Sequence, residues 1–338
     1  MAGDLPTPPQ EPGLGEFELI RRYFTRPTRR AALGVGDDCA LLECAPGMQL
    51  AVSTDMLVAG RHFFPDAEPE ALGHKALAVN LSDLAACGAQ PLAFTLALAL
   101  PEANPHWLAP FSLGLLALAD AQGCELIGGD TTRGPLNICI TVFGEVPRGQ
   151  ALLRSGARAG DDIYASGVLG AARLALEVRR GRLRLPPAAL ALACARMDRP
   201  TPRLALGLAL RGIASAAADV SDGLLGDLGH ILQQSGVGAT VNTQDALTLI
   251  AESLDESRAG GDLTAEMALA CVLAGGDDYE LVFTAPPAQR RAVQAAALAS
   301  ATAVTRIGQV QAQHGLRLVD GAGVAVANTF ASFDHFAG

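Results

Sequence analysis

Positive charge is scarce in this sequence, and lysine is almost absent. Of the 338 residues, 25 are Lys or Arg and 35 are Asp or Glu, which gives a net charge of −10. A protein that holds nucleic acid in an extended groove needs many cations to pair with phosphates, and an anionic membrane surface makes the same demand. The composition therefore argues against both kinds of partner. The single lysine, Lys75, lies in no G-x-x-x-x-G-K-[ST] sequence, which excludes a P-loop.

Long hydrophobic runs and paired cysteines are missing as well. The longest nearly apolar stretch, residues 107–119, has 13 residues, whereas a membrane-spanning helix needs about 20. The N-terminal segment holds four prolines and no cation, so it does not resemble a signal peptide, and we expect residues 1–14 to be a disordered lead-in. Seven cysteines without a C-x-x-C pair argue against a disulfide framework and a zinc site. We expect a soluble, cytoplasmic protein.

Strand and helix patterns alternate along the chain in two series that meet near residues 147–150. This alternation predicts a mixed α/β fold, with a first domain at 15–148 and a second at 149–338. The expected strands are 49–54, 91–100, 125–127, 136–146, 161–166, 216–220 and 279–284. The expected helices are 16–25, one opening at Pro69, 105–122, 170–180, 186–214 with a break at its internal prolines, and one after Gly223.

Carboxylates gather beside glycines and at the ends of the expected strands. Such strand ends are where α/β proteins usually bind ligands. Each Gly-Asp pair taken alone is an ordinary turn sequence, but six such clusters together favour a common site. Acidic groups gathered there would repel one another unless a cation bound them, and hard oxygen ligands suit Mg²⁺. The clusters are residues 36–38, 53–55, 82–83, 128–132, 219–223 and 275–278. We expect the Gly-Gly-Asp sequence at 128–130 to form a turn.

The site predicted from these residues has many acids, few bases and no side-chain nucleophile. No H-E-x-x-H or G-x-S-x-G sequence occurs. This pattern suits Mg²⁺-assisted phosphoryl transfer, in which catalysis is mostly positioning and charge neutralisation. An acceptor that is itself a phosphate is largely ionised at neutral pH and needs no general base. Arg154 could reach a phosphate or be a solvated loop residue, and the 166–170 turn could hold an anion or be an ordinary tight turn.

Two readings from other functional classes stay open on the residues alone. One is a divalent-cation-binding module without catalysis, although no D-x-[DN]-x-[DN]-G loop occurs. The other is a two-metal phosphohydrolase, which would use the same acids on one phosphate. Dependence on a nucleotide separates these two functions from phosphoryl transfer. A hydrolase needs no ATP, and a binding module catalyses no reaction.

The chain from about residue 15 to its end resembles the thiamine-monophosphate kinase family, part of the superfamily of aminoimidazole ribonucleotide synthetase and selenophosphate synthetase. The runs that carry the resemblance are GEFELI (15–20), GVGDDCA (34–40), STDMLVAGRHF (53–63), KALAVNLSDLAA (75–86), LIGGDTTRGPL (126–136), RSGARAGD (154–161), DVSDGL (219–224), GGDDYEL (275–281) and FDHF (333–336). The superfamily relatives fit less well, because the N-terminal segment lacks the reactive Cys and Lys of selenophosphate synthetase.

The resemblance implies a fold and a reaction. The fold is a two-domain aminoimidazole ribonucleotide synthetase-like architecture, in which N-terminal sheet domains pair in a homodimer and the C-terminal domain is α/β. The reaction is ATP-dependent phosphorylation of thiamine monophosphate to thiamine diphosphate, by direct in-line transfer with several Mg²⁺ ions. Another ATP-using member of the superfamily is the alternative that the resemblance leaves.

The resemblance also implies roles for individual residues. In many relatives we expect Glu where this chain has Asp277, and Tyr or Trp where it has Phe333. Asp277 is one methylene shorter than that Glu, and Phe keeps a stacking face without a polar tip. The implied ligands are Asp38, Ser53, Thr54, Asp55, Asp83, Asp130, Asp219 and Asp222 for the metals, Gly129, Asp130, Arg154 and Ser221 for ATP, and His62, Asp277 and Phe333 for thiamine monophosphate.

Overall fold

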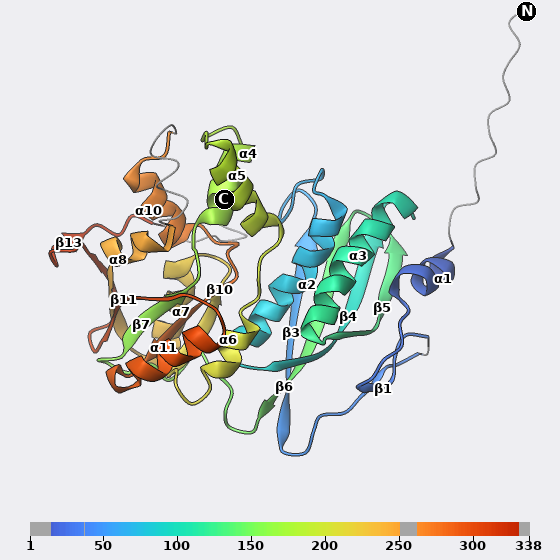
Figure 1. Cartoon of the computed structure of the whole chain (residues 1–338), viewed down its shortest axis with the longest axis horizontal. Helices are drawn as coiled ribbons and strands as arrows, with labels where there is room; N and C mark the ends of the chain where they lie inside the picture. Colours follow the sequence, from blue (N-terminus) through green and yellow to red (C-terminus); the bar gives the residue numbers. More distant parts are fainter. Residues whose placement is uncertain (1–14, 37, 251–261, 331–338) are drawn as a thin grey trace, which may run out of the picture. The chain divides into compact units, whose positions relative to one another are not determined.

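The computed structural model describes residues 15–36, 38–250 and 262–330, which form two compact units (Figure 1). The first unit contains the described residues up to Glu43 together with Asp55–Ala76 and Ala93–Ile140. The second contains Cys44–Thr54, Leu77–Leu92 and the described residues from Thr141 onward. The units follow spatial contacts rather than chain continuity, so the expected domain boundary at 148/149 stays a prediction.

A four-stranded sheet includes most of the strands before residue 148. It consists of β3 (Met48–Val58), β4 (Gln90–Leu100), β5 (Glu125–Arg133) and β6 (Asn137–Pro147), in the order β3-β6-β4-β5. Strands β1 (Ala31–Leu33) and β2 (Leu41–Leu42) form a separate antiparallel pair. The alternation of large and small side chains in 91–100 predicted β4 correctly.

Strand β5 corrects the expectation of a short strand followed by a Gly-Gly-Asp turn. The strand runs on to Arg133 because Gly128, Gly129 and Asp130 continue the parallel pairing with β4. Leu126 pairs with Phe94 and Gly128 with Thr95, so Ile127 is an extra residue in the register, a β-bulge. The first Gly-Gly-Asp sequence is therefore part of a strand.

Helices α2 (Pro69–Ala86) and α3 (Pro105–Gln122) run beside each other in Figure 1. They approach closely at glycines: a Cβ on Gly73 would lie 2.0 Å from the Phe111 carbonyl oxygen, and one on Gly114 would lie 1.9 Å from that of Glu70. Asn104 caps the start of α3 by accepting from the His106 N–H, and Gly123 in the left-handed region ends it. These local rules explain why the predicted bounds 105–122 were correct. The helical pattern at 16–25 becomes α1 (Glu16–Leu19) and a π-helical turn, η1 (Ile20–Phe24).

The second unit is built on a seven-stranded sheet in the order β13-β12-β9-β11-β7-β10-β8. Its neighbours pair antiparallel except β12 and β9, which are parallel. Strands β7, β8 and β10 are buried along their whole length. The strands are β7 (Asp162–Ser166), β8 (Ala216–Val220), β9 (Gly238–Asn242), β10 (Glu280–Ala285), β11 (Val304–Gln311), β12 (Gly315–Val319) and β13 (Ala325–Val326).

The helices of this unit bury an aliphatic core against the sheet that includes Leu174, Leu228 and Ile307. The expected helix at 186–214 is two helices, because prolines at 200 and 202 interrupt it. The helical elements are α4 (Ala171–Arg179), α5 (Pro187–Asp198), α6 (Leu204–Ala209), α7 (Leu224–Ser235), α8 (Thr243–Leu247), η2 (Thr248–Ile250), α10 (Ala265–Ala274), η3 (Pro287–Gln289) and α11 (Arg290–Ala299). The predicted mixed α/β fold is confirmed. Within the described ranges, no helix combines the length and apolar character that crossing a bilayer requires.

Candidate active site

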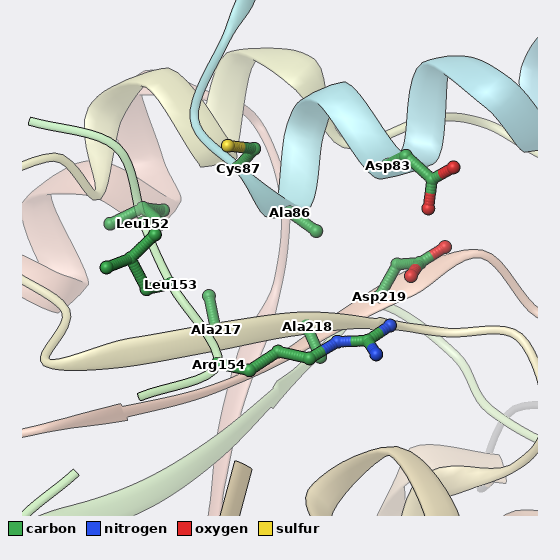
Figure 2. A pocket seen from close by; sticks show the side chains of 9 residues that line it. All are labelled: Asp83, Ala86, Cys87, Leu152, Leu153, Arg154, Ala217, Ala218 and Asp219. Carbon is green, nitrogen blue, oxygen red and sulfur yellow. The ribbon is translucent and has the colours of Figure 1, made fainter. Parts of the chain in front are cut away.

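A cavity of about 200 Å³ in the second unit has one charged end and one apolar wall (Figure 2). Three of the residues expected to bind metal or nucleotide, Asp83, Arg154 and Asp219, form the charged end. They come from α2, the segment after β6, and β8. The apolar wall consists of Ala86, Cys87, Leu152, Leu153, Ala217 and Ala218. The structure thus brings together residues that are far apart in the sequence, and it adds an apolar wall that the sequence patterns did not indicate.

Asp83 lies on the half-exposed face of α2, beside the buried residues Leu81 and Leu84. Its Oδ2 accepts a hydrogen bond of 2.5 Å from the Ser53 hydroxyl. Burial raises the pKa of the Asp83 carboxyl, and the Ser53 hydrogen bond and the charge of Arg154 offset part of that rise. Burial disfavours the ionised form of a carboxyl, and a nearby cation favours it. A cation bound at Asp83 would therefore stabilise the carboxylate.

Asp219 is buried near the end of β8, where it pairs with Leu281 of β10. In Figure 2 its carboxylate and that of Asp83 point toward the same space, and the Arg154 guanidinium extends alongside Asp219. Two carboxylates and the hydroxyl of Ser53 offer hard oxygen donors. Magnesium usually takes one or two protein carboxylates and completes its coordination with water and substrate phosphates, so this donor set fits the expected metal. Within the described ranges, no group of three or more His, Cys, Asp or Glu side chains forms a metal-binding cluster.

The turn after β8 carries Ser221 and Asp222, which the resemblance assigns to ATP and to a metal. Asp227, in the first turn of α7, shapes it. One carboxylate oxygen of Asp227 accepts from the backbone N–H groups of Ser221, Asp222 and Gly223, at 3.1, 3.1 and 3.2 Å. Burial and the charge of Asp222 raise the Asp227 pKa to about 6, although the three N–H groups lower it. Sequence reasoning missed Asp227, for which the only indication was an acid in the first turn of a helix.

A second turn, residues 275–279, lies against the first. The Asp277 N–H donates to the Ser221 carbonyl at 2.8 Å, and the Tyr279 N–H donates to the Val220 carbonyl at 2.9 Å. Asp277 has φ 63° and Tyr279 has φ 53°, both in the left-handed region. The expected thiamine-monophosphate ligand Asp277 is therefore held next to the turn expected to bind ATP and metal.

The turn at 166–170 was expected to be either an anion site or an ordinary tight turn. In the structure, carboxylates of the protein itself accept hydrogen bonds from this turn. The Gly170 N–H, at the start of α4, donates to the Asp278 carboxylate at 2.8 Å. Burial raises the pKa of this carboxyl well above its usual value. Glu280 accepts from Ser166 at 2.6 Å and forms an ion pair with Arg203. These contacts support the reading of an ordinary tight turn.

In the first unit, Gly129 and Asp130 lie at exposed positions of β5, opposite Leu96 and Ala97 of β4. Gly129 has φ 146°, and a Cβ there would lie 1.9 Å from the Leu96 carbonyl oxygen. Only glycine permits this approach of the two strands. Asp130 follows directly and is accessible for a ligand.

Other expected ligands lie near β3. The His62 Nδ1 accepts from the Val58 N–H at 3.0 Å, so the neutral ring carries its proton at Nε2. Asp55 is half-buried, and its charge adds to the burial that raises the pKa of the Cys139 thiol. The Thr54 hydroxyl, in the second unit, hydrogen-bonds to that of Thr141 at 2.8 Å. Asp38 is exposed, and Phe333 lies outside the described residues.

Comparison with known proteins gives a family. Residues 36–146 match the family described as AIR synthase related protein, N-terminal domain, and residues 150–321 match its C-terminal domain. The thiamine-monophosphate kinase of Salmonella typhimurium is 48% identical over 332 residues, which cover 96% of this chain and 98% of that protein. The chain belongs to the thiamine-monophosphate kinase family. The Escherichia coli K12 member is 45% identical over 328 residues, with the same two coverages.

Solved structures agree with membership of the thiamine-monophosphate kinase family. The thiamine-monophosphate kinase of Stenotrophomonas maltophilia superposes with a TM-score of 0.80 at 46% identity, covering 88% of this chain and 92% of that one. A structure of AaThiL complexed with AMPPCP and TMP gives 0.72 at 28% identity, covering 87% and 89%. The hydrogenase maturation protein HypE in complex with ATP shares the fold at 20% identity. The predicted family is thus confirmed.

Proposed function

We propose that this chain transfers the γ-phosphoryl group of ATP to the phosphate of thiamine monophosphate. The bond from the γ-phosphorus to the β,γ-bridging oxygen breaks, a bond to an acceptor phosphate oxygen forms, and ADP leaves. The observation that carries this proposal is the near-full-length similarity to thiamine-monophosphate kinases. The charged cavity of Asp83, Arg154 and Asp219 supports it independently.

The proposed metal ligands begin with Asp83 and Asp219, whose carboxylates face one space, and with Ser53, whose hydroxyl contacts Asp83. Magnesium bound there would neutralise the charge that accumulates between the donor and acceptor phosphates. The chain's own contribution is to fix these oxygens in a partly buried setting before the nucleotide arrives. The remaining proposed ligands are Asp38, Thr54, Asp55, Asp130 and Asp222.

Arg154, Ser221, Gly129 and Asp130 are the proposed ATP contacts. Arg154 is exposed at the charged end of the cavity, where a guanidinium can hold a phosphate with two hydrogen bonds. The Ser221 backbone N–H is already used by Asp227, so its hydroxyl is the group left to contact the nucleotide.

His62, Asp277 and Phe333 are the proposed contacts of thiamine monophosphate. A carboxylate at position 277 suits the positive charge of the thiazolium ring. The acceptor phosphate is largely ionised at neutral pH, so the proposed transfer needs no general base.

We also propose a cytoplasmic homodimer that pairs through the four-stranded sheet. Strand β3 is at the end of the sheet order, and Leu50, Val52 and Met56 lie on one face of it with exposed fractions of 49, 55 and 53%, with the exposed Thr54 between the last two. An apolar row of this kind on one face of an edge strand favours a partner sheet over water. Analytical ultracentrifugation of the wild type and of Val52→Asp would test it, with a shift toward monomer expected for the variant.

The test of the reaction is a chromatographic end-point assay with Mg·ATP and thiamine monophosphate, with free thiamine as a parallel acceptor. We expect thiamine diphosphate only from the monophosphate, one ADP per product, and no product after EDTA. Release of inorganic phosphate without a nucleotide would instead support the phosphohydrolase. No turnover with any acceptor would support the non-catalytic cation-binding module instead.

A further inference from the structure

The three consecutive N–H groups of residues 221–223, just before α7, converge on one oxygen of Asp227, at 3.1 to 3.2 Å. Such a concave row of backbone donors commonly binds the anion of a ligand. Here the protein supplies its own anion, since Asp227 is a buried side chain of the same helix, 2% exposed. The backbone donors of residues 221–223 are therefore occupied before any nucleotide binds.

The carbonyl of Ser221 is engaged as well as its N–H. It accepts from the Asp277 N–H at 2.8 Å, and a Cβ on Gly276 would lie 2.7 Å from the same oxygen. Both peptide groups of Ser221 are therefore fixed, one by Asp227 and the other by the 275–279 turn. The Ser221 hydroxyl and the Asp222 carboxylate remain as the functional groups of this turn.

We propose that Asp227 is a positioning residue for the reaction. Its carboxylate sets the backbone of residues 221–223 and thereby aims Ser221 and Asp222 at the nucleotide and metal, while the Ser221 carbonyl carries the same constraint to Asp277. An N-cap side chain accepts from N–H groups inside the first turn of a helix, whereas Asp227 accepts from the three residues that precede α7. The buried carboxylate instead ties a donor-side turn to an acceptor-side residue. This inference rests on the proposed kinase function.

The first test compares Asp227→Asn with a matched control, Asp320→Asn. Asp320 also pins a turn, accepting from the N–H groups of Ala322 and Val324 at 2.9 and 2.8 Å. It follows β12, toward the other end of the sheet order from β8. We expect Asp227→Asn to lower kcat about 10- to 100-fold and to raise the half-saturating Mg²⁺ concentration and the KM for ATP about 5- to 10-fold. Asp320→Asn should change these kinetic values less than about 2-fold.

A binding measurement separates this inference from the proposed function. Isothermal titration with a non-hydrolysable ATP analogue and Mg²⁺ should show an affinity about 10-fold lower for Asp227→Asn than for the wild type, or about 1.4 kcal/mol. A wild type that binds the analogue but makes no thiamine diphosphate would overturn the proposed reaction alone. If Asp227→Asn is less thermostable yet has wild-type kinetics and affinity, Asp227 is merely a structural cap and the inference is wrong.

A measurement on the wild type covers the case in which Asp227→Asn fails to fold. Amide hydrogen exchange should show residues 221–223 protected in the ligand-free enzyme, with little further protection when the ATP analogue binds. Amides that exchange freely until the analogue is added would mean that the ligand, and not Asp227, occupies them. That result would overturn the inference.

Discussion

The described part of the chain contains the sequence Gly-Gly-Asp twice, and the two copies have different backbone conformations. Residues 128–130 continue strand β5 in register with β4. Residues 275–277 form a turn outside any strand, with φ 69° at Gly276 and 63° at Asp277. The same three residues therefore position an acid in two ways, by strand pairing in one unit and by a strained turn in the other.

The comparison separates the roles of glycine and aspartate. In both copies the second glycine is required because a Cβ would collide with a backbone carbonyl, that of Leu96 for Gly129 and that of Ser221 for Gly276. The aspartates differ. Asp130 has ordinary strand geometry, whereas Asp277 has a left-handed φ that few residues other than Gly, Asn and Asp adopt readily.

The largest expected effect is that of Asp130→Asn on turnover. It removes a charge from the proposed metal and ATP site, so we expect kcat to fall about 10²- to 10³-fold. Asp130 is exposed, so Tm should stay within a few degrees of that of the wild type. Initial rates and thermal melting by circular dichroism would measure both. Asp120→Asn, another exposed acid of the first unit, which pairs with Arg26 at 2.9 Å, should keep its turnover; near-normal turnover in Asp130→Asn would remove Asp130 from the site.

The next largest effects are the losses of stability expected for Gly129→Ala and Gly276→Ala. A Cβ added at position 129 would lie 1.9 Å from a carbonyl oxygen, and one added at position 276 would lie 2.7 Å from another, so both substitutions should lower the free energy of unfolding. We expect about 3 kcal/mol or more for Gly129→Ala and about 1–3 kcal/mol for Gly276→Ala. Denaturant midpoints would give the values.

Gly123→Ala is the control for this pair, because Gly123 has φ 61° and no described atom within 4 Å of the added Cβ. It isolates the backbone strain alone, about 1–2 kcal/mol. Equal losses at positions 123 and 129 would show that the two strands can separate enough to admit a methyl group.

A smaller effect is expected from Asp277→Asn, which keeps a side chain tolerant of the left-handed region but removes the charge. The KM for thiamine monophosphate should rise about 10-fold while the KM for ATP stays nearly constant. Steady-state kinetics with each substrate varied in turn would measure both. A rise confined to the KM for ATP would place Asp277 on the donor side and contradict its proposed role.

The smallest effects are the changes in stability expected for Asp277→Gly and Asp130→Gly. Glycine within a strand costs about 0.5–1 kcal/mol, so Asp130→Gly should be less stable by that amount. At position 277 the relief of left-handed strain offsets the entropy that glycine adds to the unfolded state, so we expect a change below about 0.5 kcal/mol. Chemical denaturation would resolve the two, and equal losses would mean that Asp277 carries no strain.

The sequence predicted those elements that local chemistry determines. Helix α3 has its cap Asn104 and its terminator Gly123 within the chain segment itself, and its predicted bounds were correct. Strand β8, an apolar run before Ser221, was also predicted with its observed bounds. Strands β9, β11, β12 and β13 were not predicted, because their short or half-polar sequences become strands only through pairing with other segments.

The candidate site was predictable by residue type but not by arrangement. Asp83, Arg154 and Asp219 were all expected ligands, yet only the folded structure shows that these residues of α2, the segment after β6 and β8 line one cavity. Asp227 and the apolar wall were missed for the same reason. Their roles depend on which backbone groups they meet, and sequence spacing does not reveal that.

The bulge at Ile127 gives strand β5 one position at which its length can change without cost to the acid. On either side of it the ladder with β4 is regular, with Leu126 opposite Phe94, Gly128 opposite Thr95 and Asp130 opposite Ala97. A bulge sets two residues opposite one, so the residues that follow keep their partners. Deleting Ile127 would therefore leave Asp130 opposite Ala97 and facing the same side of the sheet. Inserting one residue between Gly128 and Asp130 would instead exchange the sides of the residues that follow, and would be as damaging to the site as the loss of the carboxylate itself.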